Sequence, residues 1–143
     1  MLIASQQMAS AALINDMQGC QGLIKFLEKK LDNAPSKYPS KDVKSVQKGI
    51  GQYNDYIQEQ IVSPGLLKFN GGDEGKAKAM QKQVDDYTDN VAKSYVKRYP
   101  QNQLFYDHAI ALNNCAKKAV PSGQKLENLK LALNKIVELS KIK

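Results

Sequence analysis

The chain has 143 residues, a net charge of +7, two cysteines, one histidine and no tryptophan. A chain of this length suits one domain with a single apolar core, and such a core folds without metal ions or several disulfides. The apolar runs are too short to span a bilayer, so the composition predicts a globular protein without a membrane-spanning helix.

Residues 1–11, MLIASQQMASA, resemble the end of an export signal. Residues 9–11 are small, as at the site where a signal peptide is cleaved. The apolar part is short, residues 1–4, and no basic residue precedes it. Two alternatives stay open: these residues are the remnant of an export signal, which we favour, or the first helix simply begins early, because Ala, Gln, Met and Leu tolerate helix well. In both cases residues 12–143 are predicted to form a single helical-bundle domain.

Apolar residues spaced three and four apart, the period of a helix that buries one face, dominate the first half of the chain. Pro35 ends the first stripe, because a residue before proline is pushed out of helical geometry. In the second stripe, Gly49 and Gly51 either allow close packing or only weaken the helix. The two stripes are Leu13, Met17, Cys20, Ile24, Leu27 and Leu31, and then Val43, Val46, Ile50, Tyr53 and Ile57.

The stretch SPGLLKFNGGDEG, residues 63–75, is predicted to leave helical geometry, because proline lacks an amide proton and glycines favour turns. Three further stripes follow it, within residues 77–95, 104–119 and 126–137, and we expect Tyr87 and Tyr95 to be core residues. No run alternates with period two. The sequence therefore predicts an all-α fold, an antiparallel helical bundle of four long helices plus a fifth C-terminal helix.

The sequence offers no specific motif for catalysis or for a cofactor. One histidine and no C-x-x-C exclude metal sites built on paired His or Cys ligands. Helical-bundle cytochromes of the b562 type bind haem between a methionine on the first helix and a histidine near the end of the last. Met17 could match that methionine, but His108 stands early in its helix and another helix follows, so haem is disfavoured and we expect a half-buried core histidine. The pattern S-x-x-K occurs without the companion motifs of serine hydrolases. We therefore expect no enzyme activity, no cofactor and no metal.

The basic residues gather late in the chain. Residues 113–143 carry seven lysines against two glutamates, which would attract nucleic acid or an anionic surface. However, Arg98 is the single arginine, and arginine is the residue that base readout and phosphate clamps favour. A basic cytosolic module that contacts nucleic acid or anionic surfaces is therefore the alternative hypothesis, and nucleic-acid binding is not the first choice.

Tyr99, Phe105 and Tyr106 flank a predicted turn and form a candidate interaction surface. Tyrosine offers a large contact area at low entropic cost and recurs in protein interfaces. The first hypothesis is therefore a small exported protein, periplasmic or secreted, that binds a protein partner as an inhibitor, immunity protein or chaperone does. It would act without catalysis.

Cys20 and Cys115 fall on the core stripes of the first and fourth helices. In a reducing compartment they would be two buried thiols, whereas in an oxidising one an even number of cysteines usually pairs, and here one pairing exists. We predict a Cys20–Cys115 disulfide, which requires the two helices to be neighbours with alpha carbons about 4.4 to 6.8 Å apart.

Overall fold

The structure is a computed structural model that describes the backbone of residues 2–143 and the side chains from residue 13 onward. Across this part of the chain there are helices and no strands, which confirms the all-α prediction. None of the described helices is both long and apolar enough to cross a bilayer. The elements are α1 (Leu2–Asp32), α2 (Ser40–Ile57), the π-helix η1 (Gln58–Val62), α3 (Ser63–Phe69), α4 (Glu74–Arg98), α5 (Tyr106–Lys118) and α6 (Gln124–Ser140).

The prediction for residues 1–11 concerns a segment whose side chains lie outside the described residues. Both alternatives, a signal remnant and an early helix start, are compatible with the helical backbone of α1. The export signal and the start of the mature domain near Ala12 therefore stay predictions.

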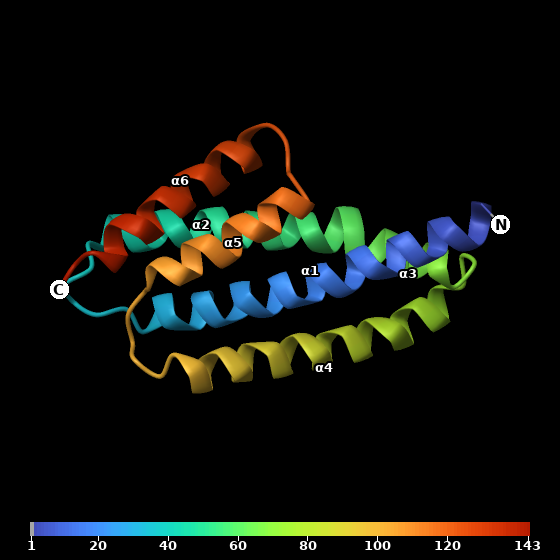
Figure 1. The fold of residues 1–143 in the computed structure, drawn as a ribbon, viewed down its shortest axis with the longest axis horizontal. Helices are drawn as coiled ribbons and strands as arrows, with labels where there is room; N and C mark the ends of the chain where they lie inside the picture. Colours follow the sequence, from blue (N-terminus) through green and yellow to red (C-terminus); the bar gives the residue numbers. More distant parts are fainter. Residues whose placement is uncertain (1) are drawn as a thin grey trace.

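Helix α1 is the centre of the bundle, with α2, α4 and α5 packed against it (Figure 1). Helix α6 covers α2 and α5, so α1, α2, α5 and α6 form a compact group, and α4 lies along the outer side of α1. Consecutive long helices run antiparallel, as short connections require. The neighbours α1 and α4 run parallel, because α2, which comes between them in the sequence, runs in the opposite direction.

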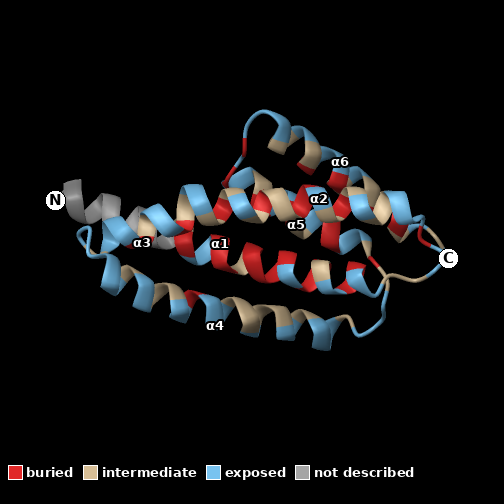
Figure 2. Ribbon diagram, turned by 180° about the vertical axis from the view of Figure 1, so that it is seen from behind, coloured by how far each residue is buried: buried red, intermediate tan, exposed pale blue. Residues whose placement is uncertain are grey.

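The predicted stripes of α1 and α2 form the core. Figure 2 shows the buried positions running along these two helices, whereas α4 is mostly exposed. Burial of large apolar side chains is the main stabilising contribution in such a bundle. The fully buried members of the two stripes are Met17, Ile24, Leu27, Val46, Ile50, Tyr53 and Ile57.

The expectation that Tyr87 belongs to the core is wrong. Tyr87 on α4 is 50% exposed, whereas Val84 is buried and Tyr95 is half-buried, with its ring stacked on Phe26 at 5.2 Å between centroids. Helix α4 packs on α1 with one side only, so the middle of its apolar stripe is buried and the edges of the stripe stay exposed. A spacing of three and four predicts the face of a helix but not how many neighbours cover it.

The segment Ser63–Phe69 is helical, contrary to the prediction that residues 63–75 leave helical geometry. Pro64 lies in the first turn of α3, directly after a π-helical turn, so the hydrogen bond that proline cannot donate falls where the chain passes from π-helix to α-helix. The π-helical turn η1 leads from α2 into α3 without a loop. The chain turns later, at Gly71 and Gly72, whose φ values of 63° and 87° favour glycine.

The two glycines of α2 have different roles. Gly49 is buried where α2 meets α6, and a Cβ atom there would lie 2.4 Å from the carbonyl oxygen of Asn128. At Gly51 the nearest atom would be Glu28 Oε1 at 3.8 Å, an ordinary contact. Gly49 therefore allows close helix packing, and Gly51 weakens the helix with no packing gain.

Candidate functional site

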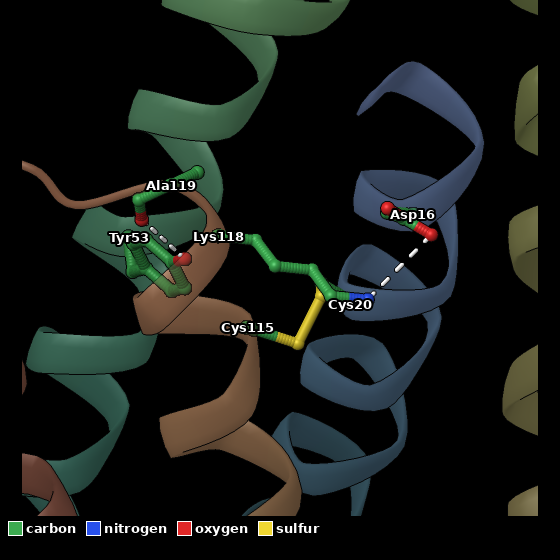
Figure 3. The surroundings of a disulfide bond; sticks show 6 residues. All are labelled: Asp16, Cys20, Tyr53, Cys115, Lys118 and Ala119. Atoms are coloured by element: carbon green, nitrogen blue, oxygen red, sulfur yellow. Dashed lines mark hydrogen bonds and ion pairs between the residues drawn. A yellow bond between two sulfur atoms is a disulfide. The ribbon is translucent and has the colours of Figure 1, made fainter. Parts of the chain in front are cut away.

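Cys20 of α1 and Cys115 of α5 are buried and lie at disulfide distance, with alpha carbons 5.9 Å apart (Figure 3). They meet because each stands on the buried face of its helix and the two helices pack side by side. The structure thus confirms that the two predicted partners are neighbours. The pair joins segments 95 residues apart in the sequence.

Cys115 lies near the C-terminal end of α5, and two polar contacts are found at that end of the helix (Figure 3). The Tyr53 hydroxyl, buried on α2, donates a hydrogen bond to the Ala119 carbonyl at 2.7 Å. Burial, and to a lesser degree the neighbouring Tyr56, raises the pKa of Tyr53, so this hydroxyl keeps its proton. Lys118 Nζ lies 3.6 Å from Asp16 Oδ1, but both side chains are about half exposed, so this ion pair adds little.

The connection between α4 and α5, residues 99–105, is attached to the C-terminal end of α1 and the loop that follows it. Lys30 Nζ donates to the carbonyl oxygen of Gln101. The backbone N–H of Leu104 donates to the buried hydroxyl of Tyr38 at 2.9 Å. The predicted turn is therefore held by specific contacts from the first third of the chain.

Two of the three predicted surface residues pack against His108. The ring centroids of Tyr99 and Phe105 lie 4.7 and 5.6 Å from that of His108, and Phe26 of α1 lies at 5.3 Å, all three edge to face. Tyr99 and Phe105 are half-buried, whereas Tyr106 is 57% exposed. Among the three, Tyr106 is thus the residue with most surface available to a partner.

Tyr106 stands at a groove between α5 and α6 with a volume of about 430 Å³. One turn further along α5, Ile110 is 45% exposed and lines the same groove, and the half-buried Leu133 and Val137 line it from α6. Lys130 brings a positive charge to it. The sequence analysis missed Ile110, although its position off the core stripe, four residues after Tyr106, was a usable signal.

His108, expected to be half-buried, is 1% exposed. Its Nδ1 accepts a hydrogen bond from the backbone N–H of Phe105 at 3.1 Å, whereas Nε2 is buried without a hydrogen-bond partner among the described residues. Burial, with a smaller effect of the Lys30 charge, lowers the pKa of His108 to about 4, and Asp107 opposes this shift. The ring is therefore neutral at neutral pH, with its proton on Nε2.

Comparison with known proteins gives no function for this chain, so a functional proposal rests on the geometry of its own structure. No family model, curated protein or solved structure matches the chain. Within the described residues, no group of three or more His, Cys, Asp or Glu side chains is placed to hold a metal ion.

Proposed function

We propose that this chain is an exported protein, periplasmic or secreted, that binds a protein partner through the groove between α5 and α6 and has no catalysis of its own. The observation that supports this is the exposure of two large apolar side chains, Tyr106 and Ile110, side by side along one groove. Exposed apolar groups that gather at one place are typical of interaction sites, and tyrosine is enriched in interface cores.

The partner we expect presents an apolar segment flanked by acidic side chains. Residues 106–143 carry seven lysines against three acidic residues, and Lys130 lies at the groove itself. Opposite charges across an interface speed the encounter and fix its orientation, while the buried apolar groups supply most of the affinity. An inhibitor, immunity protein or chaperone would use a surface of this kind.

The cysteine pair supports export, because disulfides persist in oxidising compartments and are rare in the cytosol. Thiol counting on denatured protein taken from its native compartment tests this part of the proposal. We expect no free thiol. Two free thiols per chain would contradict export and favour the alternative, a basic cytosolic module that contacts nucleic acid or anionic surfaces.

Site-specific cross-linking in cells tests the groove. A photoreactive phenylalanine analogue replaces Tyr106, and a matched control replaces Tyr87, which is 50% exposed on α4. We expect one discrete protein adduct from position 106 that is absent from position 87, and Ile110→Lys should abolish it. Equal adducts from both positions, or an adduct that survives Ile110→Lys, would contradict the proposed site.

The purified partner then allows an affinity measurement. We expect Tyr106→Ala to weaken binding at least about tenfold, or 1.4 kcal/mol, because an exposed tyrosine in an apolar groove is a typical binding hot spot. Tyr87→Ala is the control and should bind as the wild type does. An unchanged dissociation constant for Tyr106→Ala would rule out this groove.

A further inference from the structure

We propose that His108 is an acid-sensitive lock, which holds the start of α5 on α1 while its ring is neutral and releases it when the ring is protonated. The lock itself depends on the contacts around His108 and not on the proposed function. Its consequence for the groove between α5 and α6 rests on the proposed function.

Two contacts of the ring make up the lock: it packs edge to face on Phe26 of α1 at 5.3 Å between centroids, and its Nδ1 caps the start of α5. The backbone N–H of Phe105 is one of the amides at the start of α5 that no preceding helical turn can satisfy, and Nδ1 of His108, three residues on, accepts its hydrogen bond at 3.1 Å. A protonated imidazole carries hydrogen on both nitrogens and accepts no hydrogen bond. Protonation therefore removes the acceptor and sets two N–H groups against each other at the first turn of α5.

The protonated ring would be buried without a hydrogen-bond acceptor for Nε2 among the residues that the structure describes. His108 is 1% exposed, and the rings of Phe26, Tyr99 and Phe105 surround it. A buried charge without a partner is costly, so the charged ring is stabilised by moving into water.

The charged groups near the ring favour the same outcome. Lys30 from α1 places a positive charge against it, and the ring of Tyr99 at the end of α4 meets it edge to face. Asp107 on α5 is the acidic group that favours a charged ring, but it is exposed and its effect is the smallest of the three causes. On the α6 side, the charged residue at the groove is Lys130, and His108 does not line that groove. Acid therefore destabilises the closed state.

Release moves the connection 99–105 away from α1 while the other end of α5 stays attached through Cys115. Tyr106 stands directly after this connection, so its position relative to α6 changes when the lock opens. A partner bound in the groove at neutral pH would then be released in an acidic environment.

Nuclear magnetic resonance tests the lock directly, because His108 is the only histidine and its ring signals are unique. We expect a neutral ring with the proton on Nε2 at neutral pH and a proton affinity at least about tenfold below that of a free histidine. The Phe105 amide signal should change in the same pH range as the ring. A ring that titrates as free histidine does, or that titrates while the Phe105 amide stays constant, would overturn the proposal.

His108→Gln is the matched variant, because a glutamine at this position can cap the Phe105 amide and does not titrate. We expect its Phe105 amide signal to stay constant over the range in which the wild type changes. An equal change in both proteins would refute the lock. If this variant does not fold, Lys30→Met replaces it: removal of the nearby positive charge should move the wild-type transition to higher pH, and an unmoved transition counts against the lock.

Cross-linking from position 106 at neutral pH and at about pH 4, near the pKa of the His108 ring, tests the link to the groove. We expect acid to reduce the adduct in the wild type but not in His108→Gln. An adduct that persists in acid while the ring titrates as expected would refute the link between lock and groove and leave the lock standing. Absence of any adduct at neutral pH would instead contradict the proposed function.

Discussion

The two ends of α5 are held on the rest of the bundle by different chemistry. At the C-terminal end, Cys115 lies at disulfide distance from Cys20, and Tyr53 donates to the carbonyl of Ala119. None of these groups changes its charge in the neutral to mildly acidic range. At the N-terminal end, His108 packs on Phe26 of α1 and must stay neutral to accept the hydrogen bond of the Phe105 amide. One end of the helix therefore depends on redox conditions and the other on pH.

Removal of the disulfide should have the largest effect. Cys20→Ala combined with Cys115→Ala frees an unfolded loop of 95 residues, which lowers the free energy of unfolding by about 4 to 5 kcal/mol in the entropy model. Thermal unfolding followed by circular dichroism measures the loss, and reductant should reproduce it in the wild type. The helices should remain at low temperature. A loss below about 0.5 kcal/mol would show that this end of α5 is held by packing alone.

Acid should produce the next largest effect, at the other end. The pKa of His108 is about 4 in the folded protein and 6.5 in the unfolded chain, so the unfolded chain binds its proton first as the pH falls. Stability contributed by the neutral ring is complete above pH 6.5 and is lost progressively down to about pH 4, a total of about 3 kcal/mol. Urea unfolding of the wild type and of His108→Gln over this range gives the difference.

Two controls sharpen this comparison. The pKa of Glu28 is raised by burial and by Asp32 and Asp55. Glu28 therefore makes the folded protein more stable as the pH falls, which opposes the destabilising effect of His108. Because His108→Gln keeps Glu28, the difference between the two proteins isolates the ring. Gly49→Ala should lower the stability by a similar amount at every pH, since its overlap with Asn128 at 2.4 Å involves no titratable group.

Removal of either charge beside the His108 ring should shift the pKa of the ring by a smaller amount, and the two shifts should have opposite signs. Lys30→Met should raise the pKa of His108, because it removes a positive neighbour, the ammonium that lies 5.0 Å from the centre of the Phe26 ring, and keeps an apolar side chain of similar length. Asp107→Asn should lower it. Both shifts should be smaller than the effect of burial, which is the largest cause. Ring titration by nuclear magnetic resonance measures them, and two shifts of the same sign would contradict the described surroundings of the ring.

Tyr106→Ala should have the smallest effect on stability. Its side chain is more than half exposed and takes part neither in the cysteine pair nor in the hydrogen bond of His108. We therefore expect the free energy of unfolding to change by no more than about 0.5 kcal/mol and its pH profile to stay unchanged. Thermal unfolding at neutral pH measures it. A large loss would place Tyr106 in the structural core of this end and weaken its assignment as a contact residue.

Much of the redox-dependent end could be predicted from the sequence. Cys20 and Cys115 each continue an apolar stripe, which indicated that both are buried, and with two cysteines there is one pairing. The structure confirms that they are neighbours, whereas the bond itself was predicted only for an oxidising compartment. The same periodicity failed for Tyr87, because it does not report how many helices cover a face. It also failed at Pro64, which the first turn of α3 accommodates.

The acid-dependent end was harder to predict. His108 lies on an apolar stripe, which indicated some burial, but its hydrogen bond depends on the helix starting at Tyr106, and helix boundaries are the least certain part of a sequence-based prediction. The contacts of Lys30 and Tyr38 with the connection join residues more than sixty positions apart, and no local pattern reports them. Ile110 was visible as an apolar residue off the stripe, but the groove depends on where α6 packs.

Amide hydrogen exchange at both ends of α5 tests the central claim most directly. The opening free energies of residues 105–109 and 114–118 are compared at neutral pH and at about pH 5, each with and without reductant and corrected for intrinsic exchange rates. The account predicts that acid raises the opening constant of the first segment about 20-fold and leaves the second unchanged, whereas reductant loosens the second segment more than the first. Equal loosening of both segments by either treatment would contradict it.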